Sequence, residues 1–125
     1  MNLNQVTLSA ADLAPAVAFY QRLGLRLIVD ALPRYARFEC PDGESTLSLE
    51  QAPERAAGSS PVVYFECEQL DDTVERLVAA GIRFDSMPAD QPWLWREARL
   101  RDPAGNPLCL YRAGRNRRHP PWRVP

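Results

Sequence analysis

The stretch PVVYFECEQLDDTVERLVAAGIRF, residues 61–84, decides the fold because its pattern occurs twice in the chain. Shifted back by 57 positions without a gap, residues 63–84 align with residues 6–27, so that Val63 meets Val6 and Gly81 meets Gly24. In both copies apolar residues alternate, then recur at helical spacing, and a glycine follows the helical pattern. A repeat at a fixed offset predicts one strand–helix–strand unit used twice.

Alternating apolar and polar residues predict further strands on both sides of these copies. Asp12 is expected at the start of the first helix and Gly24 at its end, and the second helix has its apolar stripe at Leu70, Val74, Leu77 and Val78. The predicted strands of the first copy are 4–9, 26–30, 35–40 and 46–51, and those of the second begin near 62, 82, 93 and 107.

The predicted fold class is therefore α+β, with two βαβββ modules in a single domain over residues 1–125. The first module covers about residues 3–52 and the second covers residues 61–112. Between them, residues 53–60 are small, polar and bounded by prolines, which is typical of a linker. Residues 113–125 form a basic tail.

The charge is unevenly distributed although the net charge is only −1. Residues 112–125 contain five Arg and no acid, whereas residues 1–111 contain ten Arg against sixteen acids. We expect the tail to lie on an acidic surface of its own or a partner subunit, with Trp122 as an anchor. The alternative, a nucleic-acid contact, is disfavoured because the tail lacks the length and fold of a known reader.

Cysteine usage and the N-terminal stretch indicate the compartment. The three cysteines, Cys40, Cys67 and Cys109, form an odd set with no CxxC spacing. No apolar run approaches the ~20 residues that a membrane span needs, and the first residues lack the pattern of a signal peptide. We therefore expect a cytoplasmic protein with buried thiols and no membrane or nucleic-acid partner.

Three segments carry a resemblance to a known family: QVTLSAADLAPAVAFYQRLGL near the start, FECEQLDDTVERLVAAGI in the middle, and DPAGNPLCLY near the end. With this element order, the chain resembles the vicinal-oxygen-chelate family of glyoxalases, bleomycin-resistance proteins and extradiol dioxygenases. The resemblance covers about residues 3–112. It implies that each module forms a curved sheet with its helix outside, that the sheets enclose a cavity, and that the protein is a homodimer.

The resemblance also implies four positions at which metal-dependent members carry ligands. Here they fall on Gln5, Ser48, Val62 and Cys109. Valine cannot bind a metal, and only Gln5 is an ordinary ligand in such members. We expect no metal cofactor; the alternative is a divalent cation held by Gln5, Glu50 and Cys109.

Strand alternation predicts which other side chains face the implied cavity. Arg37 and Arg99 are equivalent in the repeat, so they suit a planar or anionic ligand unless neighbouring glutamates pair with them. Trp93 and Trp95 either wall the cavity mouth or pack in a core or interface. The predicted ligand-binding residues are Gln5, Thr7, Arg37, Ser48, Glu50, Tyr64, Trp95, Arg99, Cys109 and Tyr111.

Two functions stay open from the sequence. The first is a metal-independent protein that binds a small aromatic or charged molecule, as the bleomycin-resistance branch does. The second is a metal-dependent lyase or dioxygenase relative with a substituted site. No Ser or Cys of the body has a His beside it in the sequence to suggest a nucleophile, since the sole histidine is His119 in the tail. A minor third possibility is a structural dimer with a filled cavity.

Overall fold

The computed structural model describes residues 1–53 and 59–125. The chain divides into two compact units. The first unit is Met1–Pro61 with Asp102–Asn106, and the second unit is Val62–Arg101 with Pro107–Pro125. Most of the predicted linker falls on residues 54–58, which lie outside the described residues.

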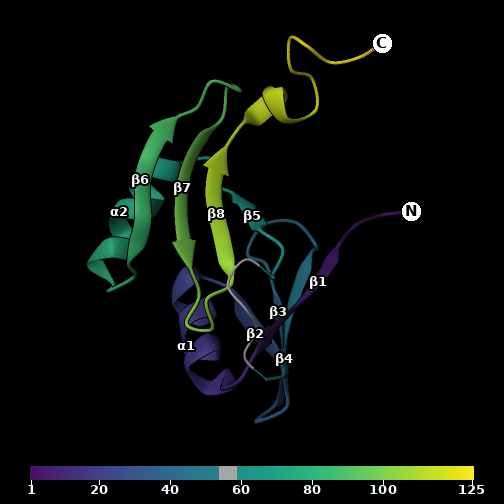
Figure 1. The fold of residues 1–125 in the computed structure, drawn as a ribbon, viewed down its shortest axis with the longest axis vertical. Helices are drawn as coiled ribbons and strands as arrows, with labels where there is room; N and C mark the ends of the chain where they lie inside the picture. The colour runs from purple at the N-terminus through teal and green to yellow at the C-terminus, as the bar shows by residue number, and fades with distance from the viewer. Residues whose placement is uncertain (54–58) are drawn as a thin grey trace. The chain divides into compact units, whose positions relative to one another are not determined.

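The first unit is a four-stranded sheet with one helix. Its elements are β1 (Gln5–Ala10), α1 (Leu13–Leu23), β2 (Arg26–Ala31), β3 (Tyr35–Glu39) and β4 (Thr46–Gln51) (Figure 1). The strand order is β1-β4-β3-β2, with β1 parallel to β4 and the other pairs antiparallel. This confirms the predicted βαβββ order of the first module.

The ends of α1 follow the residues that the sequence indicates. The Asp12 carboxylate accepts a hydrogen bond from the Ala14 amide at 3.3 Å, and Gly24 ends the helix with φ of 108°, a conformation that favours glycine. The apolar face of α1 packs against β2, β3 and β4, and the side chains of β1 and β4 on the opposite face are polar. The fully buried core of this unit includes Leu13, Tyr20, Phe38, Leu47 and Leu49.

A buried polar network also belongs to the first unit. Asp102, which is 4% exposed, accepts hydrogen bonds from the Tyr20 hydroxyl at 2.7 Å and from the Asn106 side-chain amide at 2.9 Å. Its other oxygen accepts from the backbone amides of Ala104 and Asn106, each at 2.9 Å. Asn106 also donates to the Ser9 carbonyl at 3.0 Å. The two end residues of the turn at 102–106 are therefore buried anchors, while residues 103–105 are exposed.

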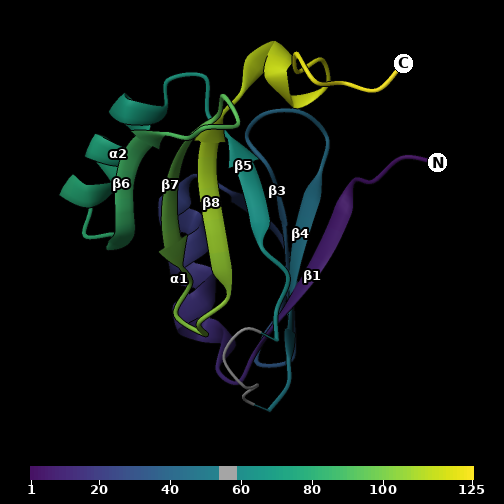
Figure 2. The same ribbon diagram turned by 45° about the horizontal axis from the view of Figure 1, so that its top comes forward.

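The second unit repeats the same plan. Its elements are β5 (Val63–Glu66), α2 (Leu70–Ala79), β6 (Phe84–Asp90), β7 (Arg96–Arg101) and β8 (Pro107–Arg112), and the strand order is β5-β8-β7-β6 (Figure 2). Strand β5 is parallel to β8, and the other pairs are antiparallel. The core side chains of this unit include Leu70, Val74, Leu77, Leu100 and Leu108.

Three predicted details of the second unit differ from the structure. Val78 is 45% exposed, because the buried stripe of α2 ends at Leu77. Strand β6 begins at Phe84, not near residue 82, and extends to Asp90, with register shifts that the alternation pattern could not reveal. Strand β7 begins at Arg96, because it is preceded by a turn in which the Gln91 amide donates to the Trp95 carbonyl and the Leu94 amide donates to the Gln91 carbonyl.

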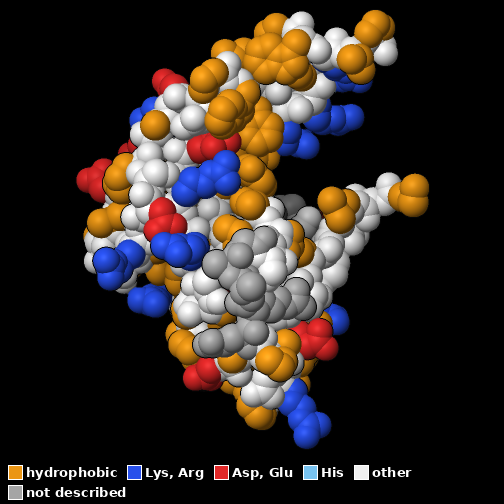
Figure 3. Space-filling model, viewed as in Figure 1, with side chains coloured by type: hydrophobic (Ala, Val, Ile, Leu, Met, Phe, Trp, Pro, Cys, Tyr) orange, Lys and Arg blue, Asp and Glu red, His pale blue; other side chains and the backbone are white. Residues whose placement is uncertain are grey.

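The basic tail begins with a short 3₁₀ helix, η1 (Gly114–Arg117), which the sequence did not indicate. The Glu66 carboxylate accepts hydrogen bonds from the backbone amides of Ala113 and Gly114, each at 2.9 Å, and this fixes the start of the tail. Further on, Trp122 is 58% exposed and Val124 is 80% exposed. Figure 3 shows apolar and arginine side chains together along this segment. In the described part of the chain, no helix is long and apolar enough to span a membrane.

Candidate functional site

In the first unit, the candidate residues lie on the sheet face opposite α1. Strand register places Thr7 opposite Ser48, and Ser48 opposite Arg37. Successive residues of a strand point to opposite faces, so these side chains share a face with Gln5 and Tyr35. The alternation pattern thus identified a single polar face within this unit.

These side chains form a hydrogen-bonded chain centred on Ser48, which is fully buried. The Gln5 amide donates to Ser48 Oγ at 2.8 Å, and the Tyr35 hydroxyl lies 2.7 Å from the same oxygen. Arg37 Nε donates to the Tyr35 hydroxyl at 2.9 Å, with the guanidinium 5.5 Å from the Tyr35 ring centroid. Thr46 donates to Gln5 Oε1. The network holds Arg37 and Tyr35 in fixed positions at its exposed end.

In the second unit, the corresponding face carries an aromatic cluster, defined here as Tyr64, Trp95 and Tyr111. The Trp95 and Tyr111 rings are stacked, with centroids 4.7 Å apart and planes 21° apart. Tyr64 meets both rings edge to face, at 6.0 Å from Trp95 and 5.6 Å from Tyr111. Tyr111 is 6% exposed, whereas Tyr64 is 43% exposed. The cluster therefore has a buried base and an accessible edge.

An ion pair with a buried carboxylate lies beside the aromatic cluster. Glu97, which is 4% exposed, accepts a hydrogen bond from Arg99 Nη2 at 3.0 Å and another from Trp93 Nε1 at 3.0 Å. Arg99 also donates to the Tyr64 hydroxyl at 3.3 Å and lies 5.4 Å from the centre of that ring. Arg99 is thus neutralised within its own unit. Whether Arg37 and Arg99 approach each other stays a prediction, as does the enclosed cavity.

The positions at which the resemblance implies metal ligands carry poor donors here. Val62 has no donor atom. The Gln5 amide is committed to the network with Ser48 and Thr46. Burial raises the pKa of the Cys109 thiol to about 11, so it is protonated at neutral pH, whereas a metal binds the thiolate. These side chains do not fit a divalent cation, and we assign them no metal-dependent step.

The alternative metal site of Gln5, Glu50 and Cys109 is also disfavoured, because Gln5 and Glu50 lie far apart in the sheet of the first unit. Gln5 pairs with Thr46 in the sheet register, and Glu50 pairs with Ser9. The two side chains therefore start four residues apart along the strands, or about 13 Å at ~3.3 Å per residue. Hard cations need several oxygen ligands converging on one point.

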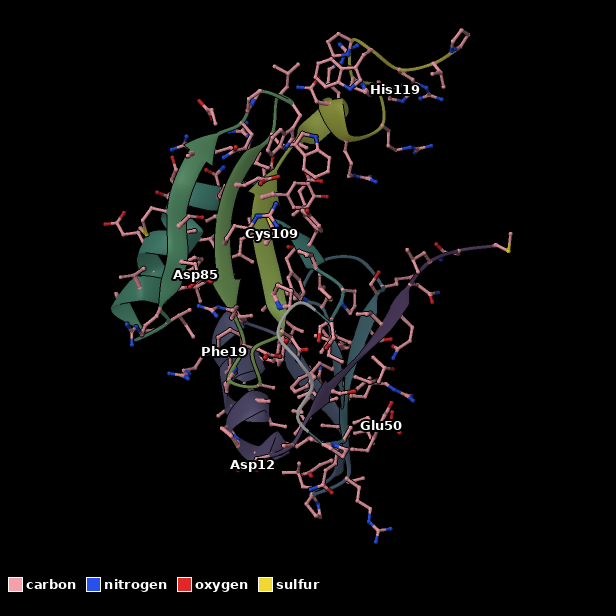
Figure 4. All side chains as sticks on the ribbon, viewed as in Figure 1. Asp12, Phe19, Glu50, Asp85, Cys109 and His119 are labelled. Carbon is pink, nitrogen blue, oxygen red and sulfur yellow. The ribbon has the colours of Figure 1, made fainter. Side chains whose placement is uncertain are left out.

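Within the second unit, the Cys109 thiol also has no histidine next to it that could act as a base. Figure 4 labels Cys109 on β8 and His119 in the tail, and His119 lies beyond the end of that strand. The Nδ1 atom of His119 is 2.7 Å from a guanidinium nitrogen of Arg123. Because the Cys109 thiol is buried and protonated and no imidazole contacts it, we interpret Cys109 as a structural residue.

The list of predicted ligand-binding residues leaves out three side chains that shape the two faces. Tyr35 joins Arg37 to Ser48, Thr46 fixes the Gln5 amide, and Trp93 donates to Glu97. Tyr35 and Thr46 share strand parity with the predicted residues, so alternation alone could have found them. Trp93 lies in the turn before β7, where no period applies.

Solved structures confirm the fold. A glyoxalase/bleomycin resistance protein/dioxygenase from Nocardioides is 27% identical and has a TM-score of 0.78, over 100% of this chain and 90% of that chain. A lactoylglutathione lyase from Agrobacterium tumefaciens is 24% identical, with a TM-score of 0.73 over 89% of this chain and 92% of its own. TioX from Micromonospora sp. ML1 is 22% identical, with a TM-score of 0.72 over 90% of this chain and 99% of its own.

None of the curated proteins compared with the chain matches it. A family model does match, over residues 2–110, which is nearly the whole of the two modules. Two four-stranded sheets with one helix each, in the order that the repeat predicts, agree with that match. The chain belongs to the Glyoxalase/Bleomycin resistance protein/Dioxygenase superfamily.

Proposed function

We propose that the protein binds a small planar organic molecule on the aromatic cluster of the second unit, without a metal ion. The observation that supports this most strongly is the cluster itself. Trp95 is stacked on buried Tyr111, and the two hold the exposed Tyr64 ring in a fixed orientation. Rigid aromatic rings offer a large contact area at a low entropic cost, and ligand sites commonly use them.

The donor chemistry favours binding over the metal-dependent reactions of other members. Glyoxalase and dioxygenase chemistry uses a metal to polarise substrate oxygens. Here the implied ligand positions carry an aliphatic side chain at Val62, a protonated thiol at Cys109, and at Gln5 an amide that is already hydrogen-bonded to Ser48. A stacked aromatic surface needs no metal to bind a planar ring.

We expect Tyr64→Ala to weaken the binding of 2-naphthamide, a neutral planar probe, by about tenfold, which corresponds to ~1.4 kcal/mol. The ring of Tyr64 is the accessible part of the cluster, so its loss removes stacking area. Tyr64→Phe keeps the ring and removes only the hydroxyl, and it should bind the probe as the wild type does. Affinities are measured by titration calorimetry in the presence of EDTA.

The same titration separates the alternatives. No binding of 2-naphthamide by the wild type, or equal binding by Tyr64→Ala and the wild type, would show that the cluster is not the site. Binding that disappears with EDTA and returns with Mn²⁺, Ni²⁺ or Zn²⁺ would instead support the metal-dependent function.

We also propose that the protein is a cytoplasmic homodimer. None of the three cysteines is in a disulfide, which supports a reducing compartment. Trp122 is exposed beside a basic segment, while residues 1–111 carry an excess of acids, so the tail of one copy suits the acidic surface of another.

Removal of residues 118–125 should shift the protein from dimer to monomer in sedimentation equilibrium at micromolar concentration. This truncation keeps η1 and its bonds to Glu66. The full chain should also dissociate in 1 M NaCl, where the screening length falls to ~3 Å. A full chain that sediments as a monomer at low salt, or a dimer that survives truncation, would contradict the proposed role of the tail.

A further inference from the structure

Arg37 and Arg99 occupy equivalent places in the repeat but differ in their partners. Arg99 is paired with the buried Glu97 carboxylate at 3.0 Å. Where the second unit has Glu97, two residues before the arginine, the first unit has Tyr35. Within residues 1–53 and 59–125, Arg37 has no acidic partner, and its two contacts are both with Tyr35. Its terminal guanidinium nitrogens remain available for hydrogen bonds.

The Tyr35 and Ser48 hydroxyl groups together carry two protons, but only one of these protons has an acceptor within this network. Arg37 Nε and Gln5 Nε2 can only donate, to Tyr35 and Ser48 respectively. The hydroxyls of Ser48 and Tyr35 share one hydrogen bond, at 2.7 Å, which uses one of their two protons. No other acceptor contacts either hydroxyl in the described part of the chain, so one proton is left over.

Burial decides which hydroxyl keeps the unused proton. Ser48 is fully buried, and a donor left unsatisfied there is costly. Ser48 therefore donates to the Tyr35 oxygen, which also accepts from Arg37. The Tyr35 side chain is partly exposed, so its own proton can point outward beside the guanidinium. Two directed donors and an unpaired positive charge then lie together on one sheet face.

We propose that Tyr35 and Arg37 form a binding site for an oxyanion, meaning a carboxylate or phosphate group of a ligand. Arg37 Nε and the Tyr35 hydroxyl oxygen are 2.9 Å apart. The terminal guanidinium N–H groups and the phenol proton therefore lie close enough together to match two oxygens of such a group. The inference goes beyond the proposed function, because it assigns a separate site for a charged group to the first unit.

Two carboxylates on the same sheet face, those of Glu39 and Glu50, influence the affinity of this site for an anion. Glu39 is paired with Arg26 at 3.4 Å, so it competes little for Arg37. Glu50 lies opposite Tyr35 in the strand register and is exposed, without an ion pair in the described chain. Its charge opposes an incoming anion, so neutralising it should strengthen binding.

The test follows the side chains of the full-length protein directly by NMR. Benzoate is titrated while the Arg37 Nε–Hε resonance is observed, and that resonance is assigned by its loss in Arg37→Gln. Benzamide is the uncharged matched probe, and inorganic phosphate is a third probe that distinguishes a phosphate site from a carboxylate site. Arg22→Gln, which changes an exposed arginine of α1, removes the same charge elsewhere in the unit.

We expect benzoate or phosphate to shift the Arg37 resonance saturably, with an affinity at least tenfold above that of benzamide. Shifts at the backbone of Tyr35 and Ser48 should follow the same curve and disappear in Arg37→Gln, while Arg22→Gln keeps them. Glu50→Gln should raise the affinity severalfold. Tyr35→Phe should lower the affinity and leave the arginine resonance observable.

Equal affinity for benzoate and benzamide, no shift with any anion, or an anion response that survives Arg37→Gln would overturn the inference. None of these results alters the outcome with 2-naphthamide, which reports on Tyr64 in the second unit. Failure of the oxyanion site and failure of the aromatic site are therefore distinguishable.

Discussion

Asp102→Ala is expected to lower the free energy of unfolding by about 3–5 kcal/mol, which is a large part of the stability of a small protein. The carboxylate is 4% exposed and accepts hydrogen bonds from the hydroxyl of Tyr20, the backbone of Ala104, and both the backbone and side chain of Asn106. Its removal leaves the buried Tyr20 hydroxyl and the Asn106 backbone amide without this acceptor, and each such group carries a desolvation cost.

A double-mutant cycle with Tyr20→Phe isolates the strongest of these bonds. Tyr20 is fully buried, and its hydroxyl lies 2.7 Å from Asp102 Oδ2. We expect Tyr20→Phe alone to cost about 1.5–3 kcal/mol, because the bond has a charged acceptor. In urea denaturation, the double variant should be less destabilised than the sum of the two single variants. Strict additivity would show that the contact contributes nothing to stability.

The pH dependence offers a second measure of the same contact. Burial, and then the charge of Asp102 and the hydrogen bond to it, raise the pKa of Tyr20 far above its ordinary value. Above about pH 10 the unfolded chain loses this proton while the folded chain keeps it, so stability falls by ~1.4 kcal/mol per pH unit. Tyr20→Phe should remove that part of the slope, and an unchanged slope would contradict the assignment.

Arg99→Gln is expected to lower the free energy of unfolding by about 1–3 kcal/mol, whereas Arg37→Gln should change it by less than ~0.5 kcal/mol. Glu97 has a side chain that is 4% exposed, so the loss of Arg99 leaves a buried charge with Trp93 as its remaining donor. The Arg99 side chain is 38% exposed, so water replaces part of the interaction, and the cost stays below that of a fully buried pair.

The two arginine variants control for each other because they make the same substitution at equivalent positions of the repeat. Thermal and urea unfolding of both, beside the double variant Arg99→Gln/Glu97→Gln, separates the charge left unpaired from the lost hydrogen bonds. The double variant should recover part of the stability. Equal effects of Arg37→Gln and Arg99→Gln would show that the pairing with Glu97 is not what distinguishes them.

The secondary structure was largely predictable because one repeat and its periods specify it. Asp12, Gly24 and the buried side of α1 follow from local rules of capping and helical spacing. Strand alternation correctly placed Ser48 and Arg37 on one face, and Arg99 and Cys109 on another. These assignments depend only on neighbours a few residues apart, which the sequence displays directly.

The energetics of the two faces were less predictable because they depend on distant partners. Nothing in the turn sequence at residues 102–106 shows that Asp102 meets Tyr20, 82 positions earlier. The difference between Arg37 and Arg99 depends on the residue two positions before each of them, Tyr35 or Glu97, and the aligned repeat did contain that signal. Trp93 lies in the turn before β7, where neither strand alternation nor helical spacing applies, so the sequence pattern could not predict its partner.

The turn at residues 102–106 has buried ends, which limits where the chain can be cut or extended. Its sequence, Asp-Pro-Ala-Gly-Asn, has the composition of a loop tip, where insertions, tags and new termini are usually tolerated. Because Asp102 and Asn106 are buried and bonded into the first unit, a circular permutant opened there would lose the network around Tyr20. The corresponding turn of the first module, at Asp42 and Gly43, is exposed and is the better place to open this protein.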